Sequence, residues 1–266
     1  MDYLESILLG IVQGLTEFLP ISSSGHLEIS KVILGNNLSN KESLLFTIVL
    51  HSATAFSTIF YFKKDLLDIF SGLLNKNYNK SHHFSVLIII SMIPAVLVGL
   101  IFEDKINSLF DGNLILVGCM LYITAILLFT SDFLKLKKKE INFKNSFLIG
   151  LVQAIAILPG ISRSGATIAS AIIIGIDREK AARFSFIMVI PIIFGSMIKS
   201  LLDHGLNFEN FDTISLLLGF ISAFITGLFA CKWMILLVKK SKLYFFSIYC
   251  LIVGSIIIFY SLYNGL

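Results

Sequence analysis

The amino-acid sequence predicts an all-α integral membrane protein with six transmembrane helices and two re-entrant helical hairpins in an inverted-topology repeat. Composition is the first observation, since 56% of the 266 residues are hydrophobic and 14% are charged, a balance typical of membrane proteins. The second is a pair of apolar regions, each interrupted by Pro, Ser and Gly residues. We expect a single membrane domain over 1–266, with repeat halves at about 1–131 and 146–263.

Six apolar runs are long enough to cross about 30 Å of hydrocarbon as helices. They are residues 44–62, 84–102, 113–131, 184–202, 213–231 and 243–263. The two interrupted regions, 3–34 and 146–176, are either broken spans or hairpins that enter and leave on one side. Irregular backbone at membrane depth is tolerated only inside protein or beside a wet cavity. Within the spans, close contacts between helices are predicted at Gly99, Gly118, Gly219 and Gly227.

The Lys and Arg residues of the loops favour a hairpin at 146–176. If this region returns to its own side, 16 loop charges lie on one face, against Lys41 and Lys105 on the other. The 16 are Lys63, Lys64, Lys76, Lys80, Lys135, Lys137, Lys138, Lys139, Lys144, Arg178, Lys180, Arg183, Lys232, Lys239, Lys240 and Lys242. If it crosses, the count becomes nine against nine. Because cytoplasmic loops carry the excess of Lys and Arg, the hairpin is predicted to enter from the cytoplasm, and 3–34, by parity and symmetry, from outside.

An internal repeat relates the two interrupted regions. At a constant offset of 140 residues, Gly10, Val12, Gln13, Ile21, Ser22, Ser24, Gly25 and Ser30 match Gly150, Val152, Gln153, Ile161, Ser162, Ser164, Gly165 and Ser170. Each half is then one hairpin followed by three spans. Because three is odd, the second half lies upside down relative to the first, which predicts an inverted repeat whose broken helices meet near the membrane midplane.

The interrupted regions also hold the ionisable groups within apolar sequence. A carboxylate such as that of Glu17 costs roughly 2.5 to 3.5 kcal/mol at bilayer depth, so it is a functional candidate by default. Arg163 is the only arginine within an apolar segment. Where two helix ends meet, free backbone N–H groups favour an anion such as phosphate, and a guanidinium suits phosphoryl oxygens. Hydroxyls that can join them are Ser22, Ser23, Ser24, Ser162, Ser164 and Thr167.

Spacing suggests two further pairings. Ser23 and His26 are three residues apart, so on a helical turn they can form a nucleophile and base pair. Gln13 and Glu17 are four apart, where an amide and a carboxylate can hold a divalent cation or orient a proton donor. His51 is expected to be a packing residue, with a place in the cavity wall as the alternative. Interfacial anchoring is expected for Trp233, Tyr244 and Tyr249.

These residues resemble the undecaprenyl-diphosphate phosphatases, also called bacitracin-resistance proteins. The first motif of that family is a Glu or Gln, three residues, then Glu, leading into Phe-Leu-Pro-x-Ser-Ser-(Ser/Thr)-Gly-His, which matches 13–26. The second, Pro-Gly-x-Ser-Arg-Ser-Gly-x-Thr, matches 159–167. The resemblance extends over essentially the whole chain. One variable position is Gln13, where many members carry Glu, so any proton or metal role of that pair would fall to Glu17.

The resemblance implies hydrolysis of undecaprenyl diphosphate to undecaprenyl phosphate and inorganic phosphate, which recycles the lipid carrier for cell-wall synthesis and confers bacitracin resistance. It implies a catalytic set of Glu17, Ser23, His26 and Arg163. The expected phosphate-binding residues are Gln13, Ser22, Ser24, Gly25, Ser162, Ser164, Gly165 and Thr167. We expect a site that opens to the outer face of the bacterial plasma membrane, with Glu17 as candidate ligand for Mg²⁺ or Ca²⁺. No organic cofactor or nucleic acid is expected, and a homodimer is an open alternative to a monomer.

The expected mechanism is in-line attack by Ser23 on the terminal phosphorus, with His26 accepting the serine proton. A phosphohistidine route through His26 stays open. Two other functions compete. A transporter or lipid flippase shares the inverted-repeat architecture, but it does not need a Ser, His and Arg set. A structural scaffold needs none of these groups.

Overall fold

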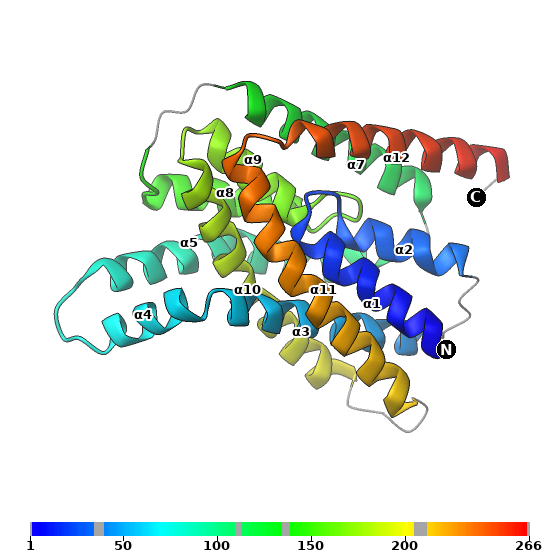
Figure 1. Cartoon of the computed structure of the whole chain (residues 1–266), viewed down its shortest axis with the longest axis horizontal. Helices are drawn as coiled ribbons and strands as arrows, with labels where there is room; N and C mark the ends of the chain where they lie inside the picture. The colour runs from blue at the N-terminus through cyan, green and yellow to red at the C-terminus, as the bar shows by residue number, and fades with distance from the viewer. Residues whose placement is uncertain (1, 35–39, 110–112, 135–138, 205–211, 265–266) are drawn as a thin grey trace.

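A computed structural model of the chain describes residues 2–34, 40–109, 113–134, 139–204 and 212–264, which form the helices α1 to α12 (Figure 1). The helices are α1 Tyr3–Phe18, α2 Ser23–Ile33, α3 Asn40–Tyr61, α4 Lys63–Leu73, α5 Lys80–Ile101, α6 Glu103–Ser108, α7 Leu114–Phe133, α8 Phe143–Ile155, α9 Arg163–Ile173, α10 Arg178–His204, α11 Thr213–Lys239 and α12 Tyr244–Asn264. The predicted all-helical class is confirmed for this described part of the chain.

Six helices of the described part are long and apolar enough to cross a membrane, so this is a multi-pass membrane protein. These spans are Ser43–Tyr61, Lys80–Ile101, Leu114–Phe133, Arg178–Lys199, Thr213–Lys239 and Tyr244–Asn264. They confirm the six predicted runs. The second begins at Lys80, before the predicted start, because the Asn79 side chain accepts hydrogen bonds from the backbone N–H groups of Ser81 and His82 and so caps the helix there.

Both interrupted regions form two short helices joined by a tight turn. The first helix of the first pair, α1, ends at Phe18, where Leu19 is extended and Pro20 follows. A residue before proline is disfavoured in the helical region, which explains this end. The second helices begin alike, since the Ser22 and Ser162 hydroxyls cap α2 and α9. The breaks therefore lie where the Pro, Ser and Gly clusters predicted them.

The two halves of the chain interlock through close helix contacts. Helix α1 packs along α11, and α8, which follows it by 140 residues, packs along α5. A Cβ added to Gly10 would lie 2.5 Å from the carbonyl oxygen of Gly219, and one added to Gly150 would lie 2.4 Å from that of Ser91. Both positions therefore need glycine because backbones approach each other there.

The predicted contacts at spanning glycines are confirmed at three of four positions. A Cβ on Gly118 would meet Ile258, one on Gly219 would meet Phe46, and one on Gly227 would meet Ser57. The prediction for Gly99 was wrong, because no atom lies within 4 Å of a Cβ added there. Its side of α5 has no packed neighbour, so the small residue there does not serve helix packing.

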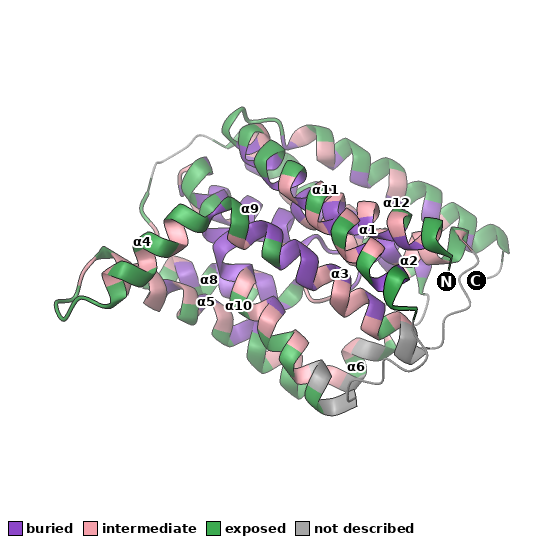
Figure 2. Ribbon diagram, turned by 60° about the horizontal axis from the view of Figure 1, so that its bottom comes forward, coloured by how far each residue is buried: buried purple, intermediate pink, exposed green. Residues whose placement is uncertain are grey.

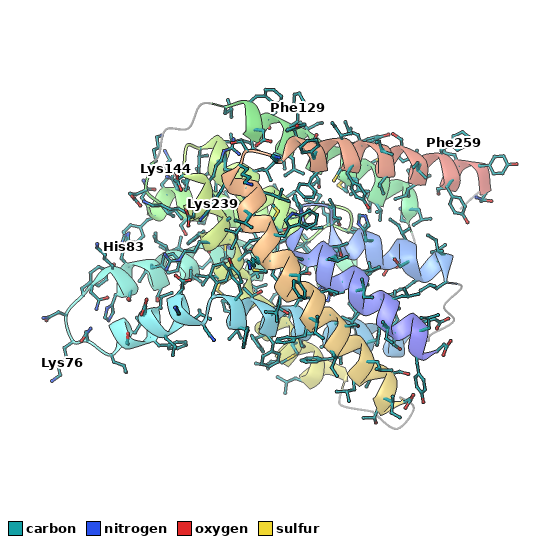
Figure 3. The ribbon with its side chains drawn as sticks, in the orientation of Figure 1. Lys76, His83, Phe129, Lys144, Lys239 and Phe259 are labelled. Carbon is teal, nitrogen blue, oxygen red and sulfur yellow. The ribbon has the colours of Figure 1, made fainter. Side chains whose placement is uncertain are left out.

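Burial is concentrated in the middle of the molecule, around α9 and the neighbouring part of α10 (Figure 2). The outward faces of α11 and α12 carry exposed apolar side chains such as Phe229 and Phe259, as lipid-facing surfaces require. Figure 3 shows Lys76, Lys144 and Lys239 toward one end of the molecule and Phe259 toward the other. Of the loop charges counted above, Lys135, Lys137, Lys138 and the side chain of Lys41 lie outside the described residues.

A buried ion pair joins three spans at the lysine-bearing end. The Arg178 guanidinium at the start of α10 donates to Asp132 Oδ1 near the end of α7 at 2.7 Å. The second oxygen of Asp132 accepts the backbone N–H of Tyr244, the first residue of α12, at 2.8 Å. Arg178 is only 4% exposed. One carboxylate thus fixes the ends of three helices.

We expect Asp132→Ala to lower the free energy of unfolding by about 3 kcal/mol, because it leaves the Arg178 charge buried without its partner. Reversible unfolding in mixed detergent micelles measures this loss. Asp65→Ala is the matched control, since Asp65 pairs with the half-exposed Arg183, and exposed pairs contribute at most about 1 kcal/mol. Equal losses in the two variants would contradict the structural role given to Asp132.

Candidate functional site

The tips of the two interrupted regions lie against each other. A Cβ added to Gly25 would lie 3.5 Å from the Cα of Gly160, and one added to Gly165 would lie 2.9 Å from the Cβ of Pro20. The Ser164 hydroxyl donates to the carbonyl oxygen of Leu19 at 3.4 Å. The starts of α2 and α9, with their backbone N–H groups, are therefore brought into one region of the molecule.

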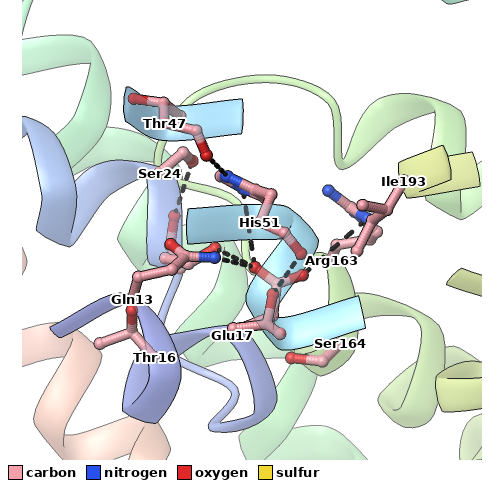
Figure 4. A network of polar contacts seen from close by, with 12 residues as sticks. Gln13, Thr16, Glu17, Ser24, Thr47, His51, Arg163, Ser164 and Ile193 are labelled. Carbon is pink, nitrogen blue, oxygen red and sulfur yellow. Dashed lines mark hydrogen bonds and ion pairs between the residues drawn. The ribbon is translucent and has the colours of Figure 1, made fainter. Parts of the chain in front are cut away.

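Glu17 lies in the last turn of α1 and is the centre of this region (Figure 4). Its side chain is 7% exposed. One carboxylate oxygen, Oε2, accepts hydrogen bonds from Gln13 Nε2 at 2.8 Å and from Ser23 Oγ at 2.9 Å. The predicted pairing of Gln13 with Glu17 on one helix face is present, and the turn after Phe18 brings Ser23 back onto the same oxygen.

Two nitrogen-bearing side chains approach Glu17 from other helices. Arg163, the first residue of α9, places Nη1 4.0 Å from Oε1, and His51 in α3 places Nε2 3.7 Å from Oε2. The Arg163 Nη1 atom is buried and has no hydrogen-bond partner. Since a buried donor is normally paired, this guanidinium keeps N–H groups available for an anionic ligand beside Glu17.

His26 contacts α12 and not Glu17. Its Nδ1 lies 2.8 Å from the carbonyl oxygen of Ser22 and its Nε2 lies 2.8 Å from the hydroxyl of Tyr249, on whose ring it stacks. The hydrogen bond of Ser23 goes to Glu17. The structure therefore does not show the pairing of Ser23 with His26 that their spacing suggested, because the Ser22 carbonyl turns the imidazole toward Tyr249.

The other predicted hydroxyls shape the two tips. Ser22 Oγ accepts the N–H of Gly25 at 3.3 Å, and Ser162 Oγ accepts that of Gly165 at 3.1 Å. Ser22 has a φ of 71°, a backbone conformation that is costly for a residue with a side chain. The hydrogen bond between its hydroxyl and Gly25 helps to hold this conformation.

Each capping serine has a second serine beside it. Ser24 lies 3.4 Å from Ser22 and Ser164 lies 3.3 Å from Ser162, measured between hydroxyl oxygens. Thr167 donates to the Arg163 carbonyl at 2.8 Å and contacts the Ser185 hydroxyl of α10. The predicted phosphate-binding residues other than Gln13 therefore lie at or next to the two tips, whereas Gln13 lies one turn before Glu17 on α1. Their role in ligand binding stays a prediction.

The surroundings of Glu17 contain oxygen atoms suited to a divalent cation. Mg²⁺ and Ca²⁺ prefer carboxylate and carbonyl oxygens, and beside the Glu17 carboxylate the buried Gln13 Oε1 has no hydrogen-bond partner. Within the described ranges, no three His, Cys, Asp or Glu side chains gather as a metal-binding group. A cation here would therefore need ligands from the substrate as well.

The sequence did not assign two of these contacts. His51 is expected from sequence to pack, with a place in the cavity wall as the alternative, and its approach to Glu17 fits the alternative; an ionisable group inside an apolar run is itself a signal of function. Tyr249 was expected at the membrane interface. Its contact with His26 joins residues 223 positions apart, so no local pattern could have indicated it.

Comparison with known proteins gives one consistent result. The family model described as bacitracin resistance protein BacA matches residues 6–256. The chain is 57% identical over 254 residues to an undecaprenyl-diphosphatase of Christiangramia forsetii, which covers 96% of both chains. It is 47% identical over 266 residues to one of Bacteroides fragilis, covering 97% of this chain and 98% of that protein. For one of Alkaliphilus metalliredigens the identity is 39% over 279 residues, covering 98% and 100%.

The His26 contact predicts the effect of Tyr249→Phe. We expect a stability loss of about 1 kcal/mol, the usual contribution of one side-chain hydrogen bond, because His26 Nε2 loses its partner. Thermal unfolding in detergent measures it, and ¹⁵N spectra of labelled histidine report the change at Nε2. Tyr260→Phe is the control, since Tyr260 lies exposed on the same helix. An unchanged His26 signal in Tyr249→Phe would show that the hydrogen bond does not exist.

Proposed function

This chain belongs to the BacA family of bacitracin resistance proteins, and on this basis we propose that it is an undecaprenyl-diphosphatase. It hydrolyses undecaprenyl diphosphate to undecaprenyl phosphate and inorganic phosphate, so it returns the lipid carrier to cell-wall synthesis and protects the cell against bacitracin. The family match over nearly the whole chain supports this activity, and the contacts around Glu17 suggest how the residues perform it.

One observation carries the chemistry. The Ser23 hydroxyl donates to the buried Glu17 carboxylate at 2.9 Å, while Arg163 from the second tip lies 4.0 Å from the other oxygen of that carboxylate. A hydroxyl beside a base and a permanent cation is what transfer of a phosphoryl group requires. A lipid transporter would need the cation but not the hydroxyl and its base.

In the proposed mechanism, the diphosphate binds at the two tips. Its terminal phosphoryl oxygens bind the Arg163 guanidinium and the N–H groups at the starts of α2 and α9. Ser23 attacks the terminal phosphorus in line, and its proton passes to Glu17, which already accepts its hydrogen bond. The bond to the bridging oxygen breaks and undecaprenyl phosphate leaves. Water then releases inorganic phosphate from the serine.

The base in this scheme differs from the one expected from sequence. Both nitrogens of His26 are occupied by Ser22 and Tyr249, and Glu17 is in contact with the nucleophile. The phosphohistidine route through His26 remains the alternative. Mg²⁺ or Ca²⁺ held by Glu17, Gln13 Oε1 and the diphosphate would withdraw negative charge from the phosphoryl oxygens.

We further propose that the paired short helices α1–α2 and α8–α9 are re-entrant hairpins of an inverted repeat in the bacterial plasma membrane. Two tip contacts support this, because Gly25 lies near Gly160 and Gly165 lies near Pro20. Positions 25 and 20 correspond to 165 and 160 at the 140-residue offset, so the two contacts are equivalent in the repeat. The lysines at one end of the molecule support a cytoplasmic orientation of that end. The first hairpin then enters from outside, so the site opens to the outer face. The single domain and the homodimer stay predictions.

The activity is tested by inorganic phosphate release from undecaprenyl diphosphate in detergent, without membrane compartments. We expect turnover by the wild type and losses of at least about 100-fold in Glu17→Ala, Ser23→Ala and Arg163→Ala. Lys199→Ala is the control for loss of an ionisable side chain outside the site, since Lys199 pairs with Glu103. Absence of phosphate release by the folded wild type, with lipid movement in vesicles, would instead support a transporter.

The nucleophile is identified by trapping. Rapid quenching with labelled substrate should leave phosphate on Ser23 as an acid-stable ester, whereas a phosphohistidine is acid-labile. Peptide mapping of the quenched enzyme locates the label. Label on His26 would remove the serine assignment while leaving the phosphatase activity in place.

A further inference from the structure

The structure assigns a role to His51, which neither motif contains: we propose that it takes up the proton that Ser23 passes to Glu17 during attack on phosphorus. This inference rests on the phosphatase activity proposed above and deepens it. His51 lies within the spanning helix α3, Asn40–Tyr61, far in sequence from Ser23 and Arg163.

The imidazole of His51 is oriented by its own helix. Its Nδ1 lies 2.9 Å from the carbonyl oxygen of Thr47. A carbonyl oxygen accepts hydrogen bonds and never donates them, so Nδ1 carries the ring hydrogen in the neutral form. The basic nitrogen is then Nε2, which faces Glu17 Oε2 at 3.7 Å (Figure 4). The side chain thus presents its proton-accepting atom to the carboxylate.

The other neighbours of Glu17 cannot take its proton. The Gln13 amide is not a base, and the Arg163 guanidinium is permanently protonated. Ser23 is the proton donor of the step. His26 is held away by Ser22 and Tyr249. Among the side chains that contact Glu17 in the described residues, His51 is therefore the base.

The same carboxylate oxygen connects donor and acceptor. Glu17 Oε2 accepts the Ser23 hydroxyl at 2.9 Å and faces His51 Nε2 at 3.7 Å. The second distance is longer than a hydrogen bond, as is common for catalytic contacts before substrate binds. A carboxylate that is 7% exposed has little access to water, so a neighbouring base matters more than it would on the surface.

The first step then balances. A bond forms between Ser23 Oγ and the terminal phosphorus, and the bond from that phosphorus to the bridging oxygen breaks, with its electron pair leaving on undecaprenyl phosphate. The serine proton passes through Glu17 to His51 Nε2, which leaves the carboxylate ionised. His51 then gives the proton to the departing phosphate or to water. In the second step, one water proton restores Ser23 and the other stays on inorganic phosphate.

The test is phosphate release by purified full-length protein with His51→Gln, which has similar size but no basic nitrogen. We expect kcat to fall about 100-fold, a typical contribution of one proton-transfer group. KM should stay within about twofold and the thermal midpoint near that of the wild type, since a group that acts in proton transfer does not contribute to binding. His83→Gln is the matched control, because His83 lies at the remote end of the molecule (Figure 3).

A double-mutant cycle separates proton transfer from packing. If Glu17 and His51 act as one unit, Glu17→Gln with His51→Gln should be no slower than Glu17→Gln alone. A wild-type kcat in His51→Gln, or losses in kcat that multiply in the double variant, would overturn the proposal. Should His51→Gln fail to fold, His51→Asn takes its place. A wild type that releases no phosphate would instead refute the phosphatase function itself, so the two failures are distinct.

Discussion

The arrangement of this protein depends on one buried carboxylate. An ionised Glu17 inside a membrane is tolerated only if opposite charge and hydrogen-bond donors surround it. No single helix can supply them, because Gln13 is the one donor that α1 itself provides. The others come from the start of α2, from α3 and from α9. Satisfying one side chain thus requires both interrupted regions and a spanning helix to converge, and the site is the product of that convergence.

Glycine and serine make the convergence possible. The tips approach to contact distance because Gly25 and Gly165 carry no side chain at the points where Gly160 and Pro20 pass. Capping serines then accept hydrogen bonds from backbone N–H groups at the helix starts, which membrane lipid cannot do. Position then decides the contacts of two candidate residues: Ser23 hydrogen-bonds to Glu17 of α1, whereas His26, one turn later, contacts Tyr249 of α12.

Much of the fold could be predicted because membrane spans are specified locally, by apolar length and by the residues that break it. The six spans and both breaks at Pro20 and Pro159 are of this kind. The presence of Glu17, Ser23 and Arg163 in one site also followed, since the repeat relates the segments that carry them. The hydrogen-bond partners of Ser23 and His26 could not be predicted in this way. Spacing on α2 suggested that Ser23 would meet His26, but tertiary contacts with Glu17 and Tyr249 decided otherwise.

The interlocked packing of the halves has a consequence for biosynthesis. Because α1 packs on α11 and α8 on α5, helix α1 emerges from the ribosome long before its main partner α11 is translated. Until then, Glu17 lacks Arg163 as well. Helix α1 can contact α2 and α3 early, but its main packing surface is completed only after α11 has been translated. The beginning of the chain is thus among the last parts to reach its full set of native contacts.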